Sequence, residues 1–316
     1  MHNLAERDDT YIARLAEFIR GEYGIAALFV APATRGHYGE TWRMDTESGS
    51  YFLKLDYFPR HREKYRNSLE VVQYLCDCGI DYVGRILPTA RGALSADFNG
   101  AVLAVFDWID GVNDESDAIK RAEYNMLVPI YNQTKPGFAI PSLVFSDEAA
   151  LRFMEKWDAL KADPKTEDEI AIRALLARHS AALHHYAARL RHFAALCAQD
   201  YSRFYLTHGD AGGNFLWGDD RNYIIDWDET MYAPPERDAW VMCCRDWAMR
   251  LFADALAQSN IGYTLRPERL AFYCYHMFFM YIGEFLDDLT LYGKRQDIEE
   301  YFDCWVMERM EYVDML

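Results

Sequence analysis

The sequence predicts an α+β protein in two lobes: a small antiparallel β-sheet with one key helix, then a larger, mainly helical lobe. Two observations support this fold class. Short apolar and β-branched runs separated by turn-forming residues fill the first third of the chain, as in antiparallel strands. From Asn113 onwards, long stretches carry apolar residues three and four positions apart, which is the spacing of helices with one buried face. We place the boundary between residues 1–107 and residues 108–316.

The strands and the first helix can be placed from local patterns. An N-terminal helix is expected over residues 9–22, ending at Gly21 or Gly24. Asn99-Gly100 suits a type I′ turn, and so it predicts a hairpin. A further amphipathic helix carries Tyr65, Leu69, Val72 and Cys76 on its buried face. The expected strands are 28–30, 41–44, 51–55, 92–98 and 101–106, a sheet of about five strands.

Helices dominate the remainder of the chain. Pro136-Gly137 and Pro141-Ser142 interrupt the helical pattern, and Pro234-Pro235 precedes a new helix, because proline fits only the first turn. The expected helices are 116–131, 147–160, 167–197, 236–256, 266–289 and 296–313.

The composition is that of an ordinary globular protein. The chain has 316 residues, of which 51% are hydrophobic and 15% aromatic, and this is ample for a core. Its 50 acidic and 33 basic residues give a formal net charge of −17, which repels nucleic-acid phosphates. We therefore expect no nucleic-acid partner. The same charge suits a cationic small molecule, although many globular proteins are simply acidic.

We expect a cytoplasmic protein that does not enter a membrane. The first residues lack a cationic segment followed by an apolar one, and no stretch approaches the roughly 18 apolar residues of a membrane span. The seven cysteines are scattered without paired CxxC units, so reduced thiols are expected. The sequence leaves the oligomeric state open.

A polar cluster is predicted at one end of a central hairpin. Short strands at 215–217 and 223–225 flank a turn at 218–222. The loop before the first strand carries Asp210 and Asn214, and the second strand ends at Asp226. The hairpin therefore brings these three side chains together.

Their chemistry points to phosphoryl transfer. Two carboxylates and an amide supply the oxygen ligands that Mg²⁺ prefers. A carboxylate that stays off the metal can accept a hydroxyl proton, and Asp210 is the natural base. An aspartate in such a segment can instead be a turn residue or a helix cap. We adopt this interpretation for Asp219 and Asp220.

The stretch THGDAGGNFLWGDDRNYIIDWDETMYAPPERD resembles the aminoglycoside phosphotransferase family, small-molecule relatives of protein kinases that include choline kinases. The segment IIDWDETMYAPPERD most resembles the spectinomycin phosphotransferase branch. The resemblance implies a two-lobed, protein-kinase-like fold. It also implies that Asp210 is the catalytic base, Asn214 a metal ligand, and Asp226 the main metal and phosphate-bridging ligand.

This chain departs from the family pattern in one place. The family has four residues between the Asp and the Asn, whereas this chain has only Ala211, Gly212 and Gly213. The departure therefore falls on the second metal position. The two glycines are expected to let the shorter loop take an unusual path, because glycine reaches positive φ without steric cost.

The resemblance also implies a nucleotide site in the first lobe. Lys54 matches the family's strand lysine, which neutralises the α- and β-phosphates, although a lysine on a sheet is often a solvated edge residue. Glu70 is the expected partner of Lys54. Glu63, nearly on the same helix face, is its competitor.

Two further segments complete the expected nucleotide site. The turn from Gly36 to Gly39 lies where kinases cover the phosphates, although a plain hairpin turn would look the same. Asp107, Trp108 and Ile109 resemble the hinge whose backbone pairs with adenine.

The predicted reaction transfers the γ-phosphoryl of ATP or GTP, with Mg²⁺, to a hydroxyl of a small cationic molecule. Asp228 and Glu229 are candidates to meet that acceptor, and solvated loop carboxylates are the alternative. One base and one metal site could act on choline, an amino sugar or methylthioribose.

Two other classes stay open. An inactive nucleotide-binding regulatory module is suggested by the shortened loop. A hydrolase with paired carboxylates would leave Lys54, Glu70 and Asn214 unexplained.

Overall fold

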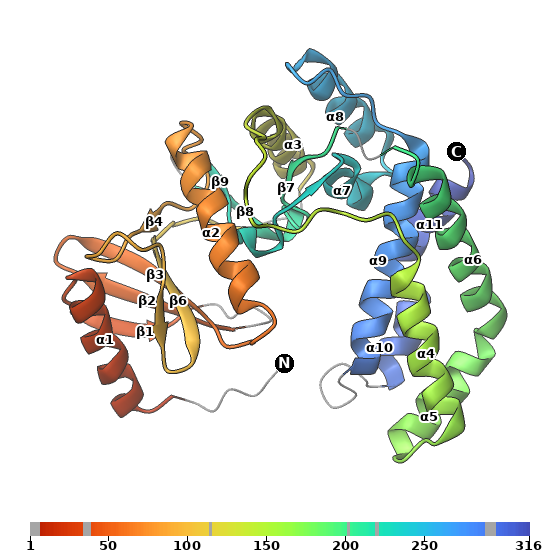
Figure 1. Cartoon of the computed structure of the whole chain (residues 1–316), viewed down its shortest axis with the longest axis horizontal. Helices are drawn as coiled ribbons and strands as arrows, with labels where there is room; N and C mark the ends of the chain where they lie inside the picture. Colours follow the sequence, from red (N-terminus) through yellow and green to blue (C-terminus); the bar gives the residue numbers. More distant parts are fainter. Residues whose placement is uncertain (1–6, 34–38, 114–115, 201–202, 219–220, 288–294) are drawn as a thin grey trace. The chain divides into compact units, whose positions relative to one another are not determined.

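A computed structural model describes residues 7–33, 39–113, 116–200, 203–218, 221–287 and 295–316. The chain divides into two compact units (Figure 1). The first consists of Met1–Pro141 and His208–Met231, and the second of Ser142–Thr207 and Tyr232–Leu316. The boundary predicted between residues 107 and 108 divides a nucleotide-binding lobe from a catalytic lobe. This division stays a prediction.

An antiparallel sheet of six strands is the frame of the first unit. The strand order is β1-β2-β3-β6-β4, and β5 pairs with β6. The predicted α+β class with an antiparallel sheet is confirmed. The additional strand, β4, has only two residues, too few to show a period. The strands are β1 (Phe29–Pro32), β2 (Gly39–Thr46), β3 (Gly49–Asp56), β4 (Ile86–Leu87), β5 (Ala96–Phe98) and β6 (Ala101–Asp107).

The register of β3 sends Lys54 away from the core. Helix α1 (Asp9–Tyr23) buries Leu15 and Ile19 in the same cluster as Leu53 and Leu55 of the sheet. Because side chains alternate along a strand, Lys54 points to the opposite face. There it meets helix α2 (Arg62–Asp77), whose Tyr65 ring centroid lies 5.3 Å from the lysine Nζ.

Caps and turns fix the ends of these elements. The Asp8 side chain accepts a hydrogen bond from Tyr11 N at the start of α1, and Gly24 ends the helix with φ of 71°. Asn99 and Gly100 have φ of 50° and 84°, as the predicted Asn-Gly turn requires.

Gly39 is required by the sheet itself. A Cβ at this position would lie 2.0 Å from the carbonyl oxygen of Leu55 on the neighbouring strand. We expect Gly39→Ala to lower the free energy of unfolding by about 1–3 kcal/mol, because the strands must move apart. Gly21→Ala in α1 is the matched control, since a Cβ there meets nothing within 4 Å. Urea unfolding should show it unchanged or stabilised by about 0.5–1 kcal/mol. Equal stability of the two variants would contradict the close approach.

The first unit also contains helix α3 (Asp117–Asn132) and the polar hairpin β8 (Phe215–Trp217) and β9 (Asn222–Ile224). Short 3-10 turns, η1 (Gly212–Asn214) and η2 (Trp227–Glu229), precede and follow this hairpin. Isolated bridges join Val83 to Ile224 and Val112 to Trp217. The hairpin is thus tied to the segment after α2 and to the segment after β6.

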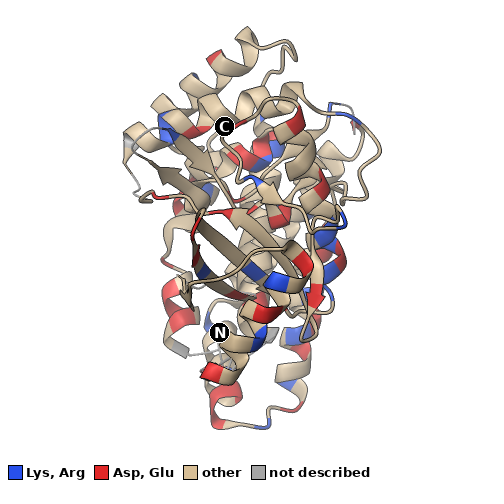
Figure 2. Cartoon of the chain, turned by 90° about the vertical axis from the view of Figure 1, so that its left-hand side faces the viewer, with Lys and Arg blue, Asp and Glu red and all other residues tan. Residues whose placement is uncertain are grey.

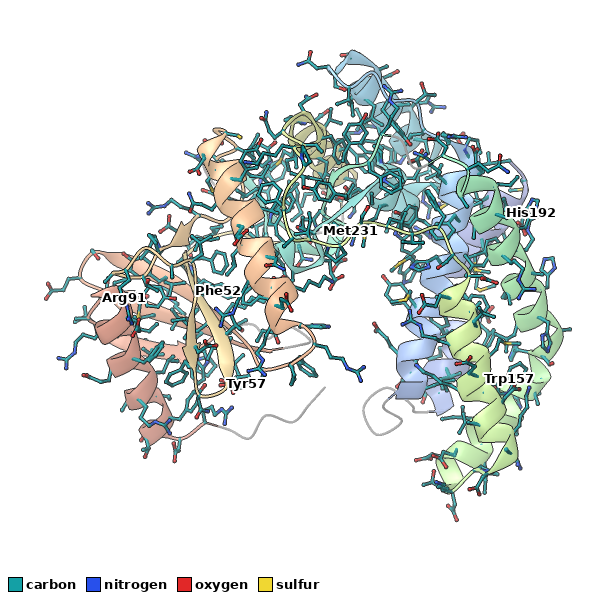
Figure 3. All side chains as sticks on the ribbon, viewed as in Figure 1. Phe52, Tyr57, Arg91, Trp157, His192 and Met231 are labelled. Carbon is teal, nitrogen blue, oxygen red and sulfur yellow. The ribbon has the colours of Figure 1, made fainter. Side chains whose placement is uncertain are left out.

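The second unit is helical around α9, whose neighbours are α4, α6 and α11. Its core is aromatic: Phe153 lies 6.3 Å from Trp157 and 5.6 Å from Phe279 between ring centroids, and Trp157 is labelled in Figure 3. The helices are α4 (Glu148–Ala162), α5 (Glu167–Arg178), α6 (Ser180–Cys197), α7 (Glu236–Ala239), η3 (Trp240–Met242), α8 (Asp246–Gln258), α9 (Pro267–Asp287), α10 (Arg295–Tyr301) and α11 (Trp305–Asp314).

Three predicted long helices are wrong because each is broken. The helix expected over 167–197 ends at Arg178 and restarts at Ser180, with His179 capping both pieces. Breaks also separate α7 from α8 and α10 from α11. The pairing of the short strands β7 (Tyr205–Thr207) and β10 (Met231–Ala233) was not predicted either.

Acidic and basic residues are interspersed along the ribbon (Figure 2). No helix among the described residues is long and apolar enough to cross a membrane. All seven cysteines are free thiols.

Candidate active site

The structure brings Asp210, Asn214 and Asp226 together through the β8–β9 hairpin. The side-chain amide of Asn214 donates to the Asp210 carboxylate at 3.1 Å and to the Asp210 backbone carbonyl at 2.8 Å. The amide of Ile225 donates to the Asn214 carbonyl at 2.9 Å, which places Asn214 beside the residue that precedes Asp226. The local pairing of two short strands therefore assembles the cluster that the sequence predicts.

His208 locks this loop to the strand end. Its ring is fully buried, and Nδ1 accepts a hydrogen bond from the Asp210 amide at 3.2 Å. Because Nδ1 accepts, Nε2 is the protonated nitrogen, and it donates to the Ile225 carbonyl at 2.9 Å. The imidazole also lies edge-on to Trp227, 4.5 Å away between ring centroids. These contacts make His208 a loop-holding residue.

The shortened loop closes as the 3-10 turn η1. Positive φ occurs at Gly209, at 88°, and not at Gly212 or Gly213. The expectation that the last two glycines serve through positive φ is therefore wrong. At Gly212 the missing Cβ leaves room for Lys120 instead, because a Cβ there would lie 2.4 Å from the lysine Nζ.

Asp226 adopts a left-handed backbone, with φ of 63° and ψ of 61°. This conformation is uncommon outside glycine and costs free energy, so the surroundings must hold it. Trp227 does so from a buried position, where its indole donates to the Ile224 carbonyl at 2.9 Å. Thr230 donates in turn to the Trp227 carbonyl at 2.6 Å.

Lys54 bridges two carboxylates. Its Nζ lies 2.5 Å from Asp226 Oδ1 and 2.5 Å from Asp228 Oδ2. Burial opposes protonation of the lysine, but the two carboxylates outweigh burial and raise its pKa. Burial likewise opposes ionisation of Asp226, yet Lys54 holds the pKa of Asp226 below its ordinary value. The Lys54–Asp226 pair is therefore fully charged at neutral pH.

The pKa values of Asp228 and Asp210 are raised, whereas that of Asp226 is lowered. Burial raises the pKa of Asp228 to about 7 against the pull of Lys54, and the negative charge of Asp226 adds to the rise. At Asp210, an exposed residue at the edge of the loop, restricted hydration and the charge of Asp226 raise the pKa. A raised pKa makes a carboxylate a better proton acceptor.

The predicted pair of Lys54 with Glu70 is absent. Glu70 and Glu63 both lie exposed on α2, and neither forms an ion pair within the part of the chain that the structure describes. The residue of α2 over Lys54 is Tyr65, 1% exposed. At about 100° per residue, Glu70 is roughly 140° from Tyr65 and Glu63 roughly 160°, so both face away. The prediction placed the wrong face of α2 over Lys54.

We therefore expect the conservative changes at Asp228 and Glu70 to differ. Asp228→Asn should lower kcat/KM for the nucleotide about tenfold, because Lys54 loses one charge-assisted hydrogen bond worth roughly 1.5 kcal/mol. Glu70→Gln is the control and should leave kcat/KM unchanged. Steady-state kinetics with varied nucleotide measures both. If Glu70→Gln were as damaging as Asp228→Asn, the α2 carboxylate would hold Lys54 in the working enzyme.

Glu229 is also paired within the chain. Lys64 of α2 lies 2.5 Å from its carboxylate. The two candidate acceptor ligands, Asp228 and Glu229, are thus each matched by a lysine. Their predicted contact with an acceptor stays a prediction.

The remaining predicted residues lie on the sheet. Gly36 falls outside the described residues, whereas Gly39 begins β2 and pairs with Asp56 of β3. Asp107 ends β6, and its carboxylate is held by Arg85 at 2.6 and 3.0 Å. The backbone amides of Asp107 and Trp108 already donate to Arg85 and Ser50 carbonyls, each at 3.1 Å. Ile109 follows them, half-buried.

The donor set fits a hard cation. Within the described ranges, no group of three or more His, Cys, Asp or Glu side chains is placed to hold a metal by itself. Asp226 and Asn214 nevertheless offer one carboxylate and one amide oxygen, and Mg²⁺ usually takes few protein ligands and completes its shell with phosphates and waters. These residues fit Mg²⁺ that arrives with a nucleotide.

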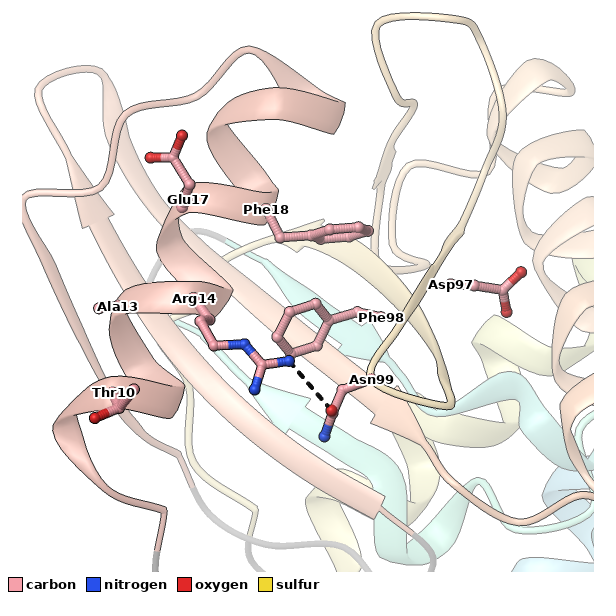
Figure 4. Close-up of a pocket in the computed structure, with 8 residues that line it drawn as sticks. All are labelled: Thr10, Ala13, Arg14, Glu17, Phe18, Asp97, Phe98 and Asn99. Atoms are coloured by element: carbon pink, nitrogen blue, oxygen red, sulfur yellow. Dashed lines mark hydrogen bonds between the residues drawn. The ribbon is translucent and has the colours of Figure 1, made fainter.

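A separate hollow lies on the first unit between α1 and the β5–β6 turn (Figure 4). Arg14, Phe18, Phe98 and Asn99 line it, and Arg14 donates to Asn99 at 3.4 Å. None of the predicted site residues belongs to its lining.

Sequence reasoning missed several residues that shape the site. Tyr65 reads as an ordinary core position, Lys64 as a solvated helix residue, and Lys120 and Asn113 lie far from the motif in sequence. Asn113 donates to the Gly213 carbonyl at 2.5 Å. These contacts join segments that are distant in the sequence, so no local sequence pattern predicts them.

Comparison with known proteins adds the family. Residues 30–273 match the model of the phosphotransferase enzyme family, APH. The chain is similar to the structure of spectinomycin phosphotransferase APH(9)-Ia in complex with ADP and spectinomycin, with a TM-score of 0.80, 21% identity and coverage of 96% of this chain and 98% of that one.

Two other solved structures share the kinase-like fold at lower similarity. Amicoumacin kinase hAmiN, in complex with AMP-PNP, Ca²⁺ and Ami, gives a TM-score of 0.63 at 16% identity, covering 100% of this chain and 96% of that one. The GDP complex of aminoglycoside 2′-phosphotransferase-IIIa gives 0.62 at 13% identity, covering 95% and 98%. These similarities establish the two-lobed fold.

Proposed function

This chain belongs to the phosphotransferase enzyme family, and we propose that it transfers the γ-phosphoryl group of a nucleoside triphosphate to a hydroxyl of a small molecule. The observation that carries the proposal is the assembly of Asp210 and Asn214 beside Asp226, with Lys54 bound to Asp226 and Asp228. One cluster thus holds a base, metal ligands and a phosphate-binding cation.

Asp210 is the proposed base. In the reaction, the acceptor oxygen forms a bond to the γ-phosphorus, and the bond from that phosphorus to the β–γ bridging oxygen breaks. The hydroxyl proton passes to the Asp210 carboxylate, and the nucleoside diphosphate leaves. The hydrogen bond from Asn214 at 3.1 Å and the bond from the Asp210 amide to His208 hold the carboxylate in place. This role is positioning combined with proton acceptance.

Asp226 and Asn214 are the proposed metal ligands. Mg²⁺ bound there would offset negative charge on the transferring group. Lys54 then exchanges a carboxylate partner for phosphate oxygens, which it can do because its ammonium carries three donors. Asp228 keeps the lysine beside the metal site during that exchange.

The nucleotide is proposed to lie against the sheet. By the family resemblance, we assign Gly39 and the segment before it to the phosphates, and the segment after β6 to the base. Because the amides of Asp107 and Trp108 are already bonded, the Ile109 amide is the donor that we assign to adenine or guanine. ATP and GTP both remain donors, since the neighbours hold ADP, AMP-PNP or GDP.

The acceptor is proposed to be a cationic small molecule with a free hydroxyl. The net charge of −17 favours such a partner, and the similar structures hold spectinomycin or Ami. Asp228 and Glu229 are its candidate ligands, and each would have to share its charge with a lysine. We place the reaction in the cytoplasm, where the nucleotide donor is available.

An acceptor screen tests the proposal. The purified protein is incubated with Mg²⁺, ATP or GTP and a panel of aminoglycosides, spectinomycin, amino alcohols and neutral sugars, and nucleoside diphosphate release is followed. Release that requires a cationic hydroxyl compound supports the function. Tight nucleotide binding without transfer to any acceptor would favour an inactive regulatory module. Release from neutral sugars alone would contradict the cationic acceptor.

A further inference from the structure

A buried charge pair on α3 lies outside every motif identified above. Lys120 and Glu123 are 8% and 4% exposed, and their Nζ and Oε2 atoms lie 3.2 Å apart. Their spacing of three residues puts both side chains on one face of the helix. Buried charges are costly unless they are paired, so this pair needs a reason to be there.

The pair lies against the loop between Asp210 and Asn214. A Cβ added to Gly212 would be 2.4 Å from Lys120 Nζ and 3.7 Å from Glu123 Oε2. The ammonium therefore occupies the space into which a side chain at position 212 would extend. Just before α3, Asn113 donates to the carbonyl of Gly213 at 2.5 Å. Two side chains from one segment thus touch two consecutive residues of the loop.

We infer that Lys120, held by Glu123, is a positioning residue that fixes the loop carrying Asp210 and Asn214. The inference rests on the proposed function for its kinetic consequence. Only Ala211, Gly212 and Gly213 separate the proposed base from the proposed metal ligand, and all three lie at or within the tight turn η1. A displacement at Gly212 has no spare residue to absorb it, so it reaches both functional side chains.

Gly212 and Lys120 form a steric pair. Glycine lets the ammonium approach the backbone, and the ammonium in turn prevents the loop from collapsing onto α3. If the Lys120–Glu123 pair served only to stabilise α3, the effects of substitutions at positions 120 and 212 on the free energy of unfolding would add. If Lys120 positions the loop, the two effects are coupled.

A double-mutant cycle of Lys120→Ala and Gly212→Ala separates them, with urea unfolding and steady-state kinetics as readouts. We expect each single variant to lower kcat at least about tenfold with little change in KM for ATP, because small misplacements of reacting groups cost up to about 100-fold. The double variant should be no worse than Lys120→Ala alone, since removing the ammonium removes the clash. Should Lys120→Ala fold poorly because Glu123 has lost the lysine, Lys120→Ala/Glu123→Ala replaces it in the cycle.

Two controls match these variants. Lys161→Ala removes the lysine of a pair at the same spacing, Lys161 with Asp158 at 2.8 Å on the exposed face of α4, and should leave kcat unchanged. Gly213→Ala adds a Cβ whose nearest neighbour, Asp210 Oδ1, is 3.7 Å away, so its effect should be smaller than that of Gly212→Ala.

The outcomes are distinct. Coupled effects in both readouts support the inference. Additive unfolding effects overturn it, whether or not the wild-type protein transfers phosphate. Unchanged kcat in Lys120→Ala with an active wild type overturns the positioning role while leaving the proposed function intact. Absence of transfer by the wild type to any acceptor contradicts the proposed function, and the unfolding cycle then decides the Lys120–Gly212 contact by itself.

Discussion

Asp210→Asn should lower kcat by at least about 100-fold while leaving nucleotide affinity nearly unchanged. The lower bound is the usual contribution of a general base. Asparagine keeps the shape of the side chain, and the Asn214 amide and the His208 ring still have partners in the loop. The loss therefore reports on proton acceptance and not on folding. Steady-state kinetics and a nucleotide titration measure the two quantities.

Asp81→Asn is the matched control for this variant. Asp81 is an exposed carboxylate of the same compact unit, paired with Arg221 at 2.6 Å. The same loss of charge there should leave kcat and nucleotide affinity unchanged. Activity of Asp210→Asn within a few-fold of wild type would remove Asp210 as the base.

Asp226→Asn should abolish the part of nucleotide affinity that depends on Mg²⁺. The effect should be at least the roughly 10- to 100-fold seen when even indirect support of a metal is lost. Asparagine tolerates the left-handed backbone at this position, with φ of 63°, so the change removes charge without adding strain. Lys54 retains Asp228 as a partner. Titration of labelled nucleotide with and without Mg²⁺ gives the result.

Asp45→Asn provides the comparison. Its carboxylate pairs with Arg43 at 2.8 Å near the end of β2. Its Mg²⁺ dependence should equal that of the wild type. Unaltered metal dependence in Asp226→Asn would transfer the ligand role to Asp228.

The hairpin cluster could be predicted from the sequence because every link in it is local. Two short strands joined by a turn determine where Asp210, Asn214 and Asp226 emerge. Strand alternation likewise placed Lys54 opposite the apolar residues that flank it. In such places a residue's neighbours in the chain determine its neighbours in space.

The partner of Lys54 could not be predicted, because it depends on the rotation of α2 over the sheet. The sequence shows that Glu63 and Glu70 share a face, but not that Tyr65 is the residue turned towards the lysine. The support of the loop by Lys120 and Asn113 could not be predicted for a similar reason, since Asn113 lies 100 residues before Gly213 and Lys120 is similarly distant from Gly212. The helix break at His179 lacks any glycine or proline signal.

Phosphorus NMR of the complete reaction tests the central claim most directly. The protein is incubated with Mg²⁺, nucleoside triphosphate and an acceptor identified by the screen, and the fate of the γ-phosphoryl is followed. We predict a new phosphomonoester signal that grows as the triphosphate is consumed, requires the acceptor, and is lost in Asp210→Asn. Release of inorganic phosphate alone, at equal rates with and without acceptor, would contradict phosphoryl transfer to an alcohol.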